Sequence, residues 1–589
     1  MKKNVLFIVI DSVTNDILFN KNNSKDIAPF MNSLRKKSIS GDKMYSEAPY
    51  TEAALMSLLG GIDTMDNGGY LERMKNKRNV LEDFTENGYK TFFCNYFPSI
   101  YPSYLVNGYT ERKYIDGFHF SHIWGYRFEY YASLYLENKT TKEENNMLLD
   151  MLEDNFKAWI EYLEKIKNKD VETTMLNDCV DIADIDKNIV LLKKEYDKFN
   201  IDKVNYITKL FKEKHEHILF KINEHKMSDK IGNDSVRNEI MTKYTDTFKK
   251  IAKLNFNRNI KNNRFPLIKT INSILNKDIK TAKGLIAGYK NSLFDKDLYE
   301  RIGPGFDMFK DQRSFYTVAN ELIDWIDNNK QEVWMSYVHI DDAHYTESFF
   351  TYDTDNIEIV DKEFELINKY LDKLPKDYKG SIAYDLSLMY CDNIIKKIFN
   401  YLEKENLLDN TNVVITADHG FSYYFSPVRE RYVISNYKEN YNVPFIIYGK
   451  NIKSRKIKGY CSTKDIPVTL LSIAGIKKYK QYKGNNLLTY DGDNYALLEY
   501  MGGGCPDIKR RPINLGVKTD NYSVTIYAYI NKDFADIEIK EVYDLKMDPY
   551  EHKNLSNKAD IKILIKDELD ILSRRFNEIK KQYKGVCND

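Results

Sequence analysis

The sequence lacks the features that mark several large classes of protein. Its 6 cysteines are scattered, and no two have the spacing of zinc knuckles or redox motifs, so we expect reduced thiols. It contains no run of roughly 18 uncharged apolar residues, the length that a transmembrane helix needs. The apolar stretch at residues 4–10 ends at Asp11, too early for a secretory signal. We therefore expect a cytoplasmic protein without a membrane anchor.

The sequence also lacks an excess of charge of either sign. The 88 Lys and Arg residues face 87 Asp and Glu residues, so no overall field favours nucleic acid. At 589 residues the chain exceeds the usual size of a single hydrophobic core. We expect a large domain with at least one additional unit, and the sequence gives no sign of its oligomeric state.

Proline and glycine are nearly absent from a long internal segment, residues 130–298. Lys, Glu, Asn and Asp are interleaved there with Leu, Ile and Tyr at helical spacing. We predict a helical insertion at residues 126–312, either a solvated cap that packs on itself or a lid or partner-binding surface. Its histidines are predicted to be surface residues and not ligands: His215, His217 and His225.

The rest of the chain alternates between strand and helix patterns. Residues 4–10 form a continuous apolar run rich in β-branched residues, which is typical of a strand covered on both faces in a parallel sheet. We predict an α/β fold whose central, mostly parallel sheet is flanked by helices. The core is expected at residues 1–125 and 313–490, followed by a small C-terminal α+β subdomain at 491–589.

Metal-ligand side chains end two of the predicted strands. Asp11 ends the first strand, and Asp418 and His419 end a later one, just before Gly420. Parallel sheets place ligands at their carboxyl edge, where carboxylate and imidazole groups can hold a hard or borderline metal ion. A helix cap is the alternative role for Asp11 or Asp418, but it would not explain His419.

Thr51 opens the helix predicted at APYTEAALMSLLGG. At a helix N-terminus its oxygen could attack a phosphorus or sulfur centre while the helix stabilises the anion, although a simple N-cap is the commoner use of threonine. Glu52 is expected to complement the helix dipole without a catalytic role. In VHIDDAHY, His339 or His344 could protonate a leaving group or contact a nonbridging oxygen; we favour His344, and one of the two could be structural.

Taken in order, these segments resemble the sulfatase-like branch of the alkaline phosphatase superfamily, which includes phosphoglycerol and phosphoethanolamine transferases. NVLFIVIDS resembles the opening strand, APYTEAALMSLLGG the nucleophile segment, and NVVITADHG the metal-binding Asp-His-Gly, over about residues 1–125 and 313–560. The resemblance implies a metal site, a nucleophile, catalytic histidines and substrate contacts. The metal site would consist of Asp11, Asp418, His419 and Thr51, and Thr51 would also be the nucleophile. The catalytic histidines would be His344 and His339. The substrate contacts would be His344 and Asp342.

The sequence departs from true sulfatases at the nucleophile. Those enzymes generate formylglycine from cysteine or serine, with arginine four residues later, whereas this chain has Thr51 and Leu55. Ser12 stands where many sulfatases have a second acid, and Thr14 replaces a frequent arginine. The resemblance therefore implies one divalent ion, Mn²⁺ or Zn²⁺ with Mg²⁺ also possible, while the acids and histidines of VHIDDAHY leave a second ion open.

We predict a metal-dependent phosphoester hydrolase or phosphotransferase that forms a covalent intermediate on Thr51. The metal would lower the pKa of the Thr51 hydroxyl. The expected substrate is a small-molecule, glycan-precursor or lipid-precursor phosphodiester or phosphoglycerol-type group. A sulfuric ester hydrolase is one alternative. An inactive homologue that binds a partner through its insertion is another, because Leu55 and Ser12 replace family residues.

Overall fold

The structure, a computed structural model, describes most of the chain. It covers residues 2–19, 26–66, 70, 78–96, 108–116, most of 128–221, pieces of 242–286, and residues 309–310, 314–340, 342–344, 350–351, 357–374, 382–421, 436–501 and 511–583.

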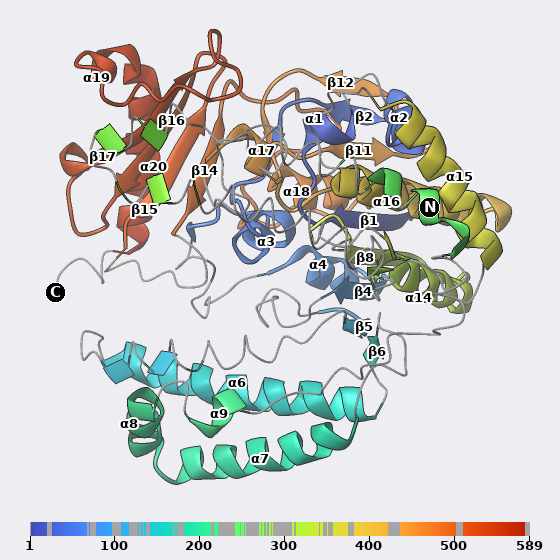
Figure 1. Ribbon diagram of the computed structural model, residues 1–589, viewed down its shortest axis with the longest axis horizontal. Helices are drawn as coiled ribbons and strands as arrows, with labels where there is room; N and C mark the ends of the chain where they lie inside the picture. The colour runs from blue at the N-terminus through green and yellow to red at the C-terminus, as the bar shows by residue number, and fades with distance from the viewer. Residues whose placement is uncertain are drawn as a thin grey trace.

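A nine-stranded sheet forms the centre of the molecule (Figure 1). β1 lies between β8 and β10, and all pairs from β10 across to β6 are parallel. β11 runs antiparallel to both of its neighbours. The predicted α/β fold with a mostly parallel sheet is therefore confirmed. In spatial order the strands are β12 (Arg455–Ile457), β2 (Ile39–Gly41), β11 (Phe445–Tyr448), β10 (Thr411–Thr416), β1 (Asn4–Ile10), β8 (Trp334–Ile340), β4 (Lys90–Tyr96), β5 (Glu111–Asp116) and β6 (Val171–Thr173).

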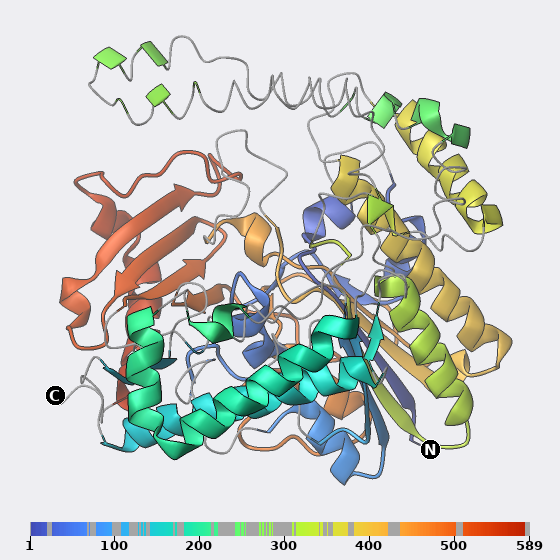
Figure 2. The ribbon, with the colours of Figure 1, turned by 60° about the horizontal axis from the view of Figure 1, so that its bottom comes forward.

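Helices cover both faces of this sheet (Figure 2). The central strands β1, β8 and β10 are buried along their whole length, which explains their unbroken apolar patterns. One face carries α2 (Pro29–Lys36), α14 (Ser314–Asn328) and α16 (Ile382–Lys404). The opposite face carries α3 (Thr51–Gly60), α4 (Val80–Glu86) and α18 (Asp465–Ile473).

A second, antiparallel sheet follows near the C-terminus, as drawn in red in Figure 1. Its strands are β14 (Ala496–Tyr500), β15 (Ile513–Lys518), β16 (Tyr522–Ala528) and β17 (Glu538–Asp544), and α20 (Lys566–Gln582) packs on it. The shorter elements are α1 (Asn15–Leu18), β3 (Met44–Tyr45), β7 (Phe309–Lys310), β9 (Phe350–Thr351), α15 (Ile357–Asp372), η5 (Leu408–Asn410), α17 (Lys438–Tyr441), β13 (Cys461–Ser462), η6 (Phe534–Asp536) and α19 (Ile561–Leu564).

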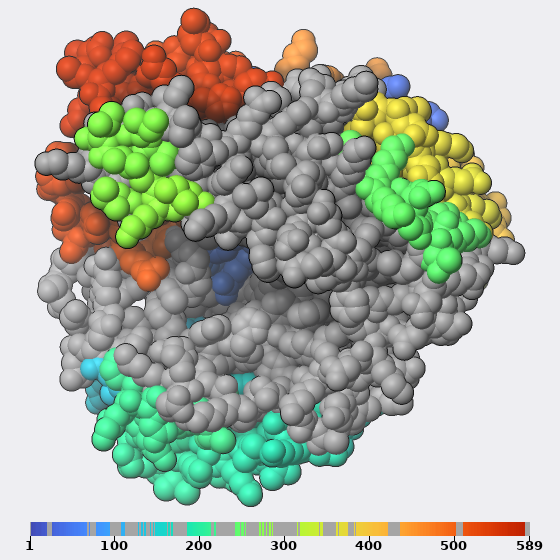
Figure 3. All heavy atoms as spheres, in the orientation of Figure 1, coloured from blue at the N-terminus to red at the C-terminus, as the bar shows by residue number. Residues whose placement is uncertain are grey.

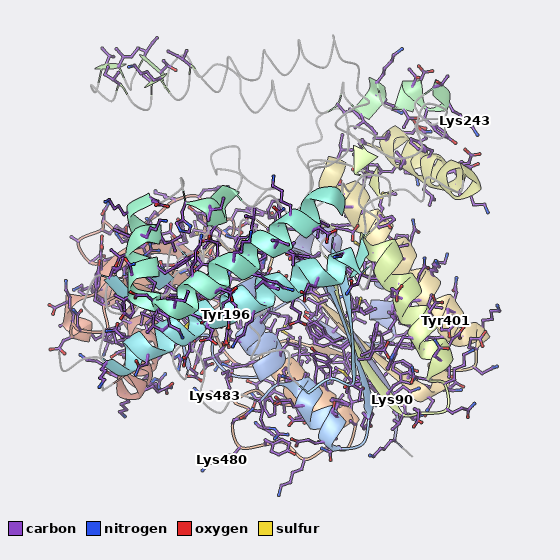
Figure 4. All side chains as sticks on the ribbon, turned by 90° about the horizontal axis from the view of Figure 1, so that it is seen from below. Lys90, Tyr196, Lys243, Tyr401, Lys480 and Lys483 are labelled. Carbon is purple, nitrogen blue, oxygen red and sulfur yellow. The ribbon has the colours of Figure 1, made fainter. Side chains whose placement is uncertain are left out.

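Long helices within residues 142–213 form a layer with a hydrophobic cluster of its own, separate from the main core. They are α6 (Lys142–Lys167), α7 (Ile182–Ile201) and α8 (Lys203–Glu213), with the short α9 (Ile218–Lys221) beside them. Tyr196, labelled in Figure 4, reaches from α7 to Glu153 of α6. The surface location predicted for His217 is wrong: its ring is 2% exposed and packs on Tyr206, because it faces this cluster. His215 and His225 lie outside the described residues.

Two further expectations concern redox state and membranes. Cys94, Cys391 and Cys461, the cysteines that the structure describes, are buried free thiols. Among the described residues, no helix combines the length and apolarity that crossing a bilayer requires.

Charged side chains join the C-terminal sheet to the segment that follows α3. Arg575 of α20 pairs with Glu499 of β14 at 2.8 Å and with Asp66 at 3.1 Å. Lys483, labelled in Figure 4, contacts the same Asp66 at 2.6 Å. The backbone oxygen of Glu47, four residues before Thr51, accepts a 2.7 Å hydrogen bond from the Glu499 amide. The second sheet therefore helps to fix the segment that carries Thr51.

Stability should depend on pH through Glu47. Burial, reinforced by Asp63 and Glu499 and opposed by Lys464 at 2.8 Å, raises the pKa of this carboxyl from 4.5 to about 8. As pH rises from about 5 to 8, the unfolded chain releases this proton before the folded chain does, so the folded state loses stability. Glu47→Gln should make the free energy of unfolding less dependent on pH across this range, as measured by denaturant titration at several pH values. The exposed control Glu538→Gln should leave the pH dependence of the free energy of unfolding unchanged. If Glu47→Gln also left it unchanged, the assignment would be contradicted.

Candidate active site

The carboxyl edge of three adjacent strands brings Asp11, His339 and Asp418 together. His339 of β8 is level with Val9 of β1, and Val9 is level with Thr416 of β10. Asp11 lies two residues after Val9, and Asp418 lies two residues after Thr416. The side chains of His339, Asp11 and Asp418 therefore belong to one face of the sheet. One potential ligand atom from each of the three lies within 4.8 Å of the others, and all three side chains are buried.

Thr51 joins this cluster from the N-terminus of α3. The N-cap is Tyr50, so Thr51 is the first helical residue and not the cap. Its hydroxyl oxygen lies 3.1 Å from Asp11 Oδ2 and 3.4 Å from His419 Nε2. In Figure 3 blue atoms are visible at the floor of a hollow where Figure 1 places α3. The first turn of α3, whose N–H groups have no intrahelical acceptor, thus meets the cluster at the sheet edge.

The ring of His419 is oriented by a backbone acceptor. Its Nδ1 lies 2.8 Å from the carbonyl oxygen of Gly420. Because a carbonyl accepts but cannot donate, Nδ1 carries the hydrogen, and the neutral ring leaves a lone pair on Nε2. This Nε2 lies 3.4 Å from Asp11 Oδ1 and 3.6 Å from Asp418 Oδ2. His419 is therefore presented as a nitrogen ligand.

Gly420 allows this turn by a close approach of the backbone. A Cβ atom at this position would lie 1.9 Å from the backbone oxygen of Glu439. The Gly420 amide donates to the oxygen of Asn440 at 2.8 Å. Any residue with a side chain would therefore force the backbone at this position or at Glu439 to move.

The cluster fits a divalent cation. Asp11 and Asp418 are 5% and 0% exposed, and two buried carboxylates this close need a compensating positive charge. Among the described residues, Asp418 Oδ2 has no hydrogen-bond donor. Asp11, Asp418, His419 and the Thr51 hydroxyl are thus placed to hold an ion, as the resemblance implied. The sequence reasoning kept His339 open only for a second ion, whereas the structure places it beside Asp11 and Asp418.

The carboxylates and histidines of the site shift one another's pKa. Burial alone would raise the pKa of Asp11, but the nearby His344, His419 and His339 hold it below its usual value. Burial alone would lower the pKa of His419, but the Asp418 and Asp11 carboxylates hold it above its usual value. For His339 burial prevails and lowers the pKa. Burial and the neighbouring groups of opposite charge therefore act in opposite directions on the pKa of each of these three residues.

His344 has a different position from His339. It is half-buried, and its ring centroid lies 6.4 Å from that of His419. Asp342 is 4% exposed, two residues before it, and Asp341 lies outside the described residues. His344 is therefore beside the cluster and more accessible than His339, which is 3% exposed.

Ser12 and Tyr384 orient the two carboxylates. Ser12 adopts φ 63°, a left-handed conformation that is uncommon outside glycine. Its amide donates to Asp418 Oδ1 at 3.2 Å and its hydroxyl to Asp11 Oδ1 at 2.7 Å. The Tyr384 hydroxyl donates to the Ser12 carbonyl at 2.6 Å and accepts from the Thr14 amide at 3.2 Å. Sequence reasoning treated Ser12 as a lost acid and missed Tyr384, because no motif marks it on its helix.

Removing the Tyr384 hydroxyl should loosen the site. Tyr384→Phe leaves a buried carbonyl and a buried amide without their partner, which costs about 1–3 kcal/mol of stability. Because the turn orients both carboxylates, we also expect divalent metal affinity to fall about 10–100-fold. Isothermal titration calorimetry measures this effect. Tyr401→Phe, on the same helix and labelled in Figure 4, is the matched control and should leave metal affinity unchanged.

Comparison with known proteins agrees with this geometry. Residues 233–476 match the family model described as Sulfatase, a range that includes His339, His344, Asp418 and His419. The match begins inside the predicted insertion, and Asp11 and Thr51 lie outside it.

Curated relatives are matched over part of their length. N-acetylglucosamine-6-O-sulfatase of Bacteroides thetaiotaomicron is 29% identical over 219 residues, which are 34% of this chain and 36% of that protein. N-acetylglucosamine-6-sulfatase of Bos taurus is 27% identical over 212 residues, which are 30% of this chain and 37% of that protein. The chain thus spans little more than a third of the length of these relatives.

Solved structures share the fold across nearly the whole chain. The phosphonate monoester hydrolase of Agrobacterium radiobacter has a TM-score of 0.52 at 12% identity, covering 98% of this chain and 96% of that one. A candidate sulfatase from Bacteroides thetaiotaomicron has a TM-score of 0.51 at 12% identity, covering 99% and 94%. At these identities the likeness shows the fold alone. With the family match over residues 233–476, it confirms the predicted recognition of a sulfatase-like chain with a sulfatase-like α/β fold.

Proposed function

We propose that this chain is a metal-dependent hydrolase of esters of a tetrahedral oxyanion, with Thr51 as its nucleophile. The observation that carries the proposal is the position of the Thr51 hydroxyl, 3.1 Å from Asp11 and 3.4 Å from His419 at the N-terminus of a helix. Members of the sulfatase family are metal-dependent hydrolases, and the buried cluster around Asp418 suits that chemistry.

Asp11, Asp418, His419 and Thr51 would hold one divalent ion, which we propose to be Mn²⁺ or Zn²⁺. The ion would supply positive charge to the ester oxygens. The mixed carboxylate and imidazole donors favour such ions over those that prefer oxygen alone.

The chain's own residues account for the two halves of the reaction. Thr51 Oγ attacks the central phosphorus or sulfur atom, the bond from that atom to the alcohol oxygen breaks, and Asp11 is the nearest acceptor for the Thr51 proton. His344 is placed to protonate the departing alcohol. Water then attacks the same central atom, which releases the oxyanion and restores the Thr51 hydroxyl. The N-terminus of α3 stabilises the negative charge in both halves.

The substrate class has two candidates, each favoured by a different observation. The names of the relatives support a sulfate ester, the alternative raised from the sequence, better than the phosphoester interpretation. Thr51 favours a phosphoester, because threonine cannot be converted into formylglycine. In either case we propose a small-molecule, glycan-precursor or lipid-precursor substrate and a cytoplasmic location.

Turnover assays with matched substrates separate these classes. The purified protein would be assayed with an aryl sulfate, an aryl phosphate and an aryl phosphodiester, each with added Mn²⁺, Zn²⁺ or Mg²⁺. Metal-dependent turnover of any of these supports the proposal, and the preferred ester identifies the class. No turnover of any ester by a metal-loaded protein would count against it and favour the inactive-homologue hypothesis.

A further inference from the structure

We propose that His339 is a metal ligand and not a proton donor, and that its imidazole makes this site select Zn²⁺ over Mg²⁺ and Ca²⁺. The inference deepens the proposed function and rests on the presence of a metal at that site. His339 entered the sequence interpretation as a catalytic acid, and its surroundings argue for the different role.

The first argument is the row that His339 occupies in the sheet. His339 pairs with Val9. Asp11 lies two residues after Val9 and continues the ladder, because its amide donates to the Ile340 oxygen at 2.7 Å. His339 thus lies one row deeper than Asp11, behind the carboxylates. A proton donor to a leaving group needs contact with the substrate, and the half-buried His344 is better placed for that contact.

The second argument is the spacing of the donor atoms. His339 Nε2 lies 3.9 Å from Asp11 Oδ2 and 3.8 Å from Asp418 Oδ2. These separations exceed hydrogen-bond length. They approach the spacing of about 3.4 Å between two ligands that each lie about 2.1 Å from a tetrahedral zinc ion. The equal separation from both carboxylates points to a shared ion between them.

The third argument is the other ring nitrogen. His339 Nδ1 lies 3.3 Å from the hydroxyl oxygen of Tyr337, two residues earlier on the same strand. Metal-binding histidines use the second nitrogen for such an orienting hydrogen bond, which leaves Nε2 to the ion. His419 is held in the same way by Gly420.

The resulting donor set explains the expected selectivity. His339 and His419 supply two imidazole nitrogens beside the carboxylates of Asp11 and Asp418, while Ser12 removes the acid that many sulfatases carry. Mg²⁺ and Ca²⁺ prefer sites made of oxygen ligands, whereas imidazole suits Zn²⁺. Loss of one imidazole should therefore weaken Zn²⁺ binding much more than Mg²⁺ binding.

The test measures metal binding and not turnover. Metal-free wild type, His339→Asn and His344→Asn would be titrated with Zn²⁺, Mg²⁺ and Ca²⁺ by competition calorimetry, with thermal melts of the metal-free proteins to check folding. We expect His339→Asn to lose at least about 100-fold in Zn²⁺ affinity with less than tenfold change for Mg²⁺, and His344→Asn to bind Zn²⁺ like wild type. Pulsed electron paramagnetic resonance of the Mn²⁺ forms should detect two coupled imidazole nitrogens in wild type and one in His339→Asn.

Two results would overturn the inference, and they are distinguishable. Zn²⁺ affinity and nitrogen couplings that His339→Asn leaves unchanged would remove His339 from the metal site while leaving the proposed function intact. Failure of wild type to bind any of these ions would remove the metal itself and the proposed function with it.

Discussion

Replacing Thr51 with alanine is expected to lower kcat/KM by at least about 10³-fold while the protein remains folded. The hydroxyl oxygen is the atom that attacks, so its loss removes the bond that forms in the transition state. The change removes only two heavy atoms from a helical residue and alanine favours helices, so the fold should tolerate it. Steady-state kinetics on the preferred ester, with a thermal melt of each protein, measure both effects.

Thr51→Ser is the matched control for that experiment. It keeps the attacking oxygen and removes one methyl group, so it should retain far more activity than the alanine variant. Equal loss in both variants would mean that the methyl packing of Thr51, and not its oxygen, supports activity.

Replacing Asp418 with asparagine is expected to abolish both tight metal binding and turnover. Asparagine keeps an oxygen that can accept from the Ser12 and His419 amides, at 3.2 and 2.7 Å in the native protein, so the turn should survive. It removes the charge of a carboxylate that is completely buried beside Asp11. A bound ion stabilises the folded state by about 2.7 kcal/mol at 100 times its dissociation constant, and this gain should disappear in the variant.

Thermal melts with and without metal test this second prediction. Wild type should melt at a higher temperature when Zn²⁺ or Mn²⁺ is present, and Asp418→Asn should not respond. Without metal the variant should be at least as stable as wild type, because the repulsion between two buried carboxylates is relieved. Asp16→Asn, whose carboxylate pairs with Lys438 and not with the metal cluster, is the control. A metal-dependent shift that persists in Asp418→Asn would remove this residue from the site.

The parts of the fold that follow from local pattern could be predicted from the sequence. β1, β8 and β10 are buried on both faces, so their apolar residues run without interruption and reveal a parallel sheet. Asp11, Asp418 and His419 could be found because each lies within three residues of the end of such a run. β6 has no comparable signal, although it pairs with β5 from within the predicted insertion. The break at Ile565 between α19 and α20 also has none.

The parts of the site that depend on pairing between distant segments could not be predicted. The depth of His339 depends on the register between β8 and β1, which the sequence of either strand does not contain. The same holds for Tyr384, 372 residues from the Ser12 carbonyl to which it donates. His217 was misjudged for a related reason, since its burial depends on packing between separate helices.

Mass spectrometry of the acid-quenched enzyme tests the central claim most directly. Metal-loaded protein would be mixed with its preferred ester, quenched within one turnover and digested. The account predicts that the peptide containing Thr51 carries one phosphoryl or sulfuryl group on that residue, and that Thr51→Ala carries none. Turnover at the normal rate with no group on Thr51, or with the group on another residue, would contradict it.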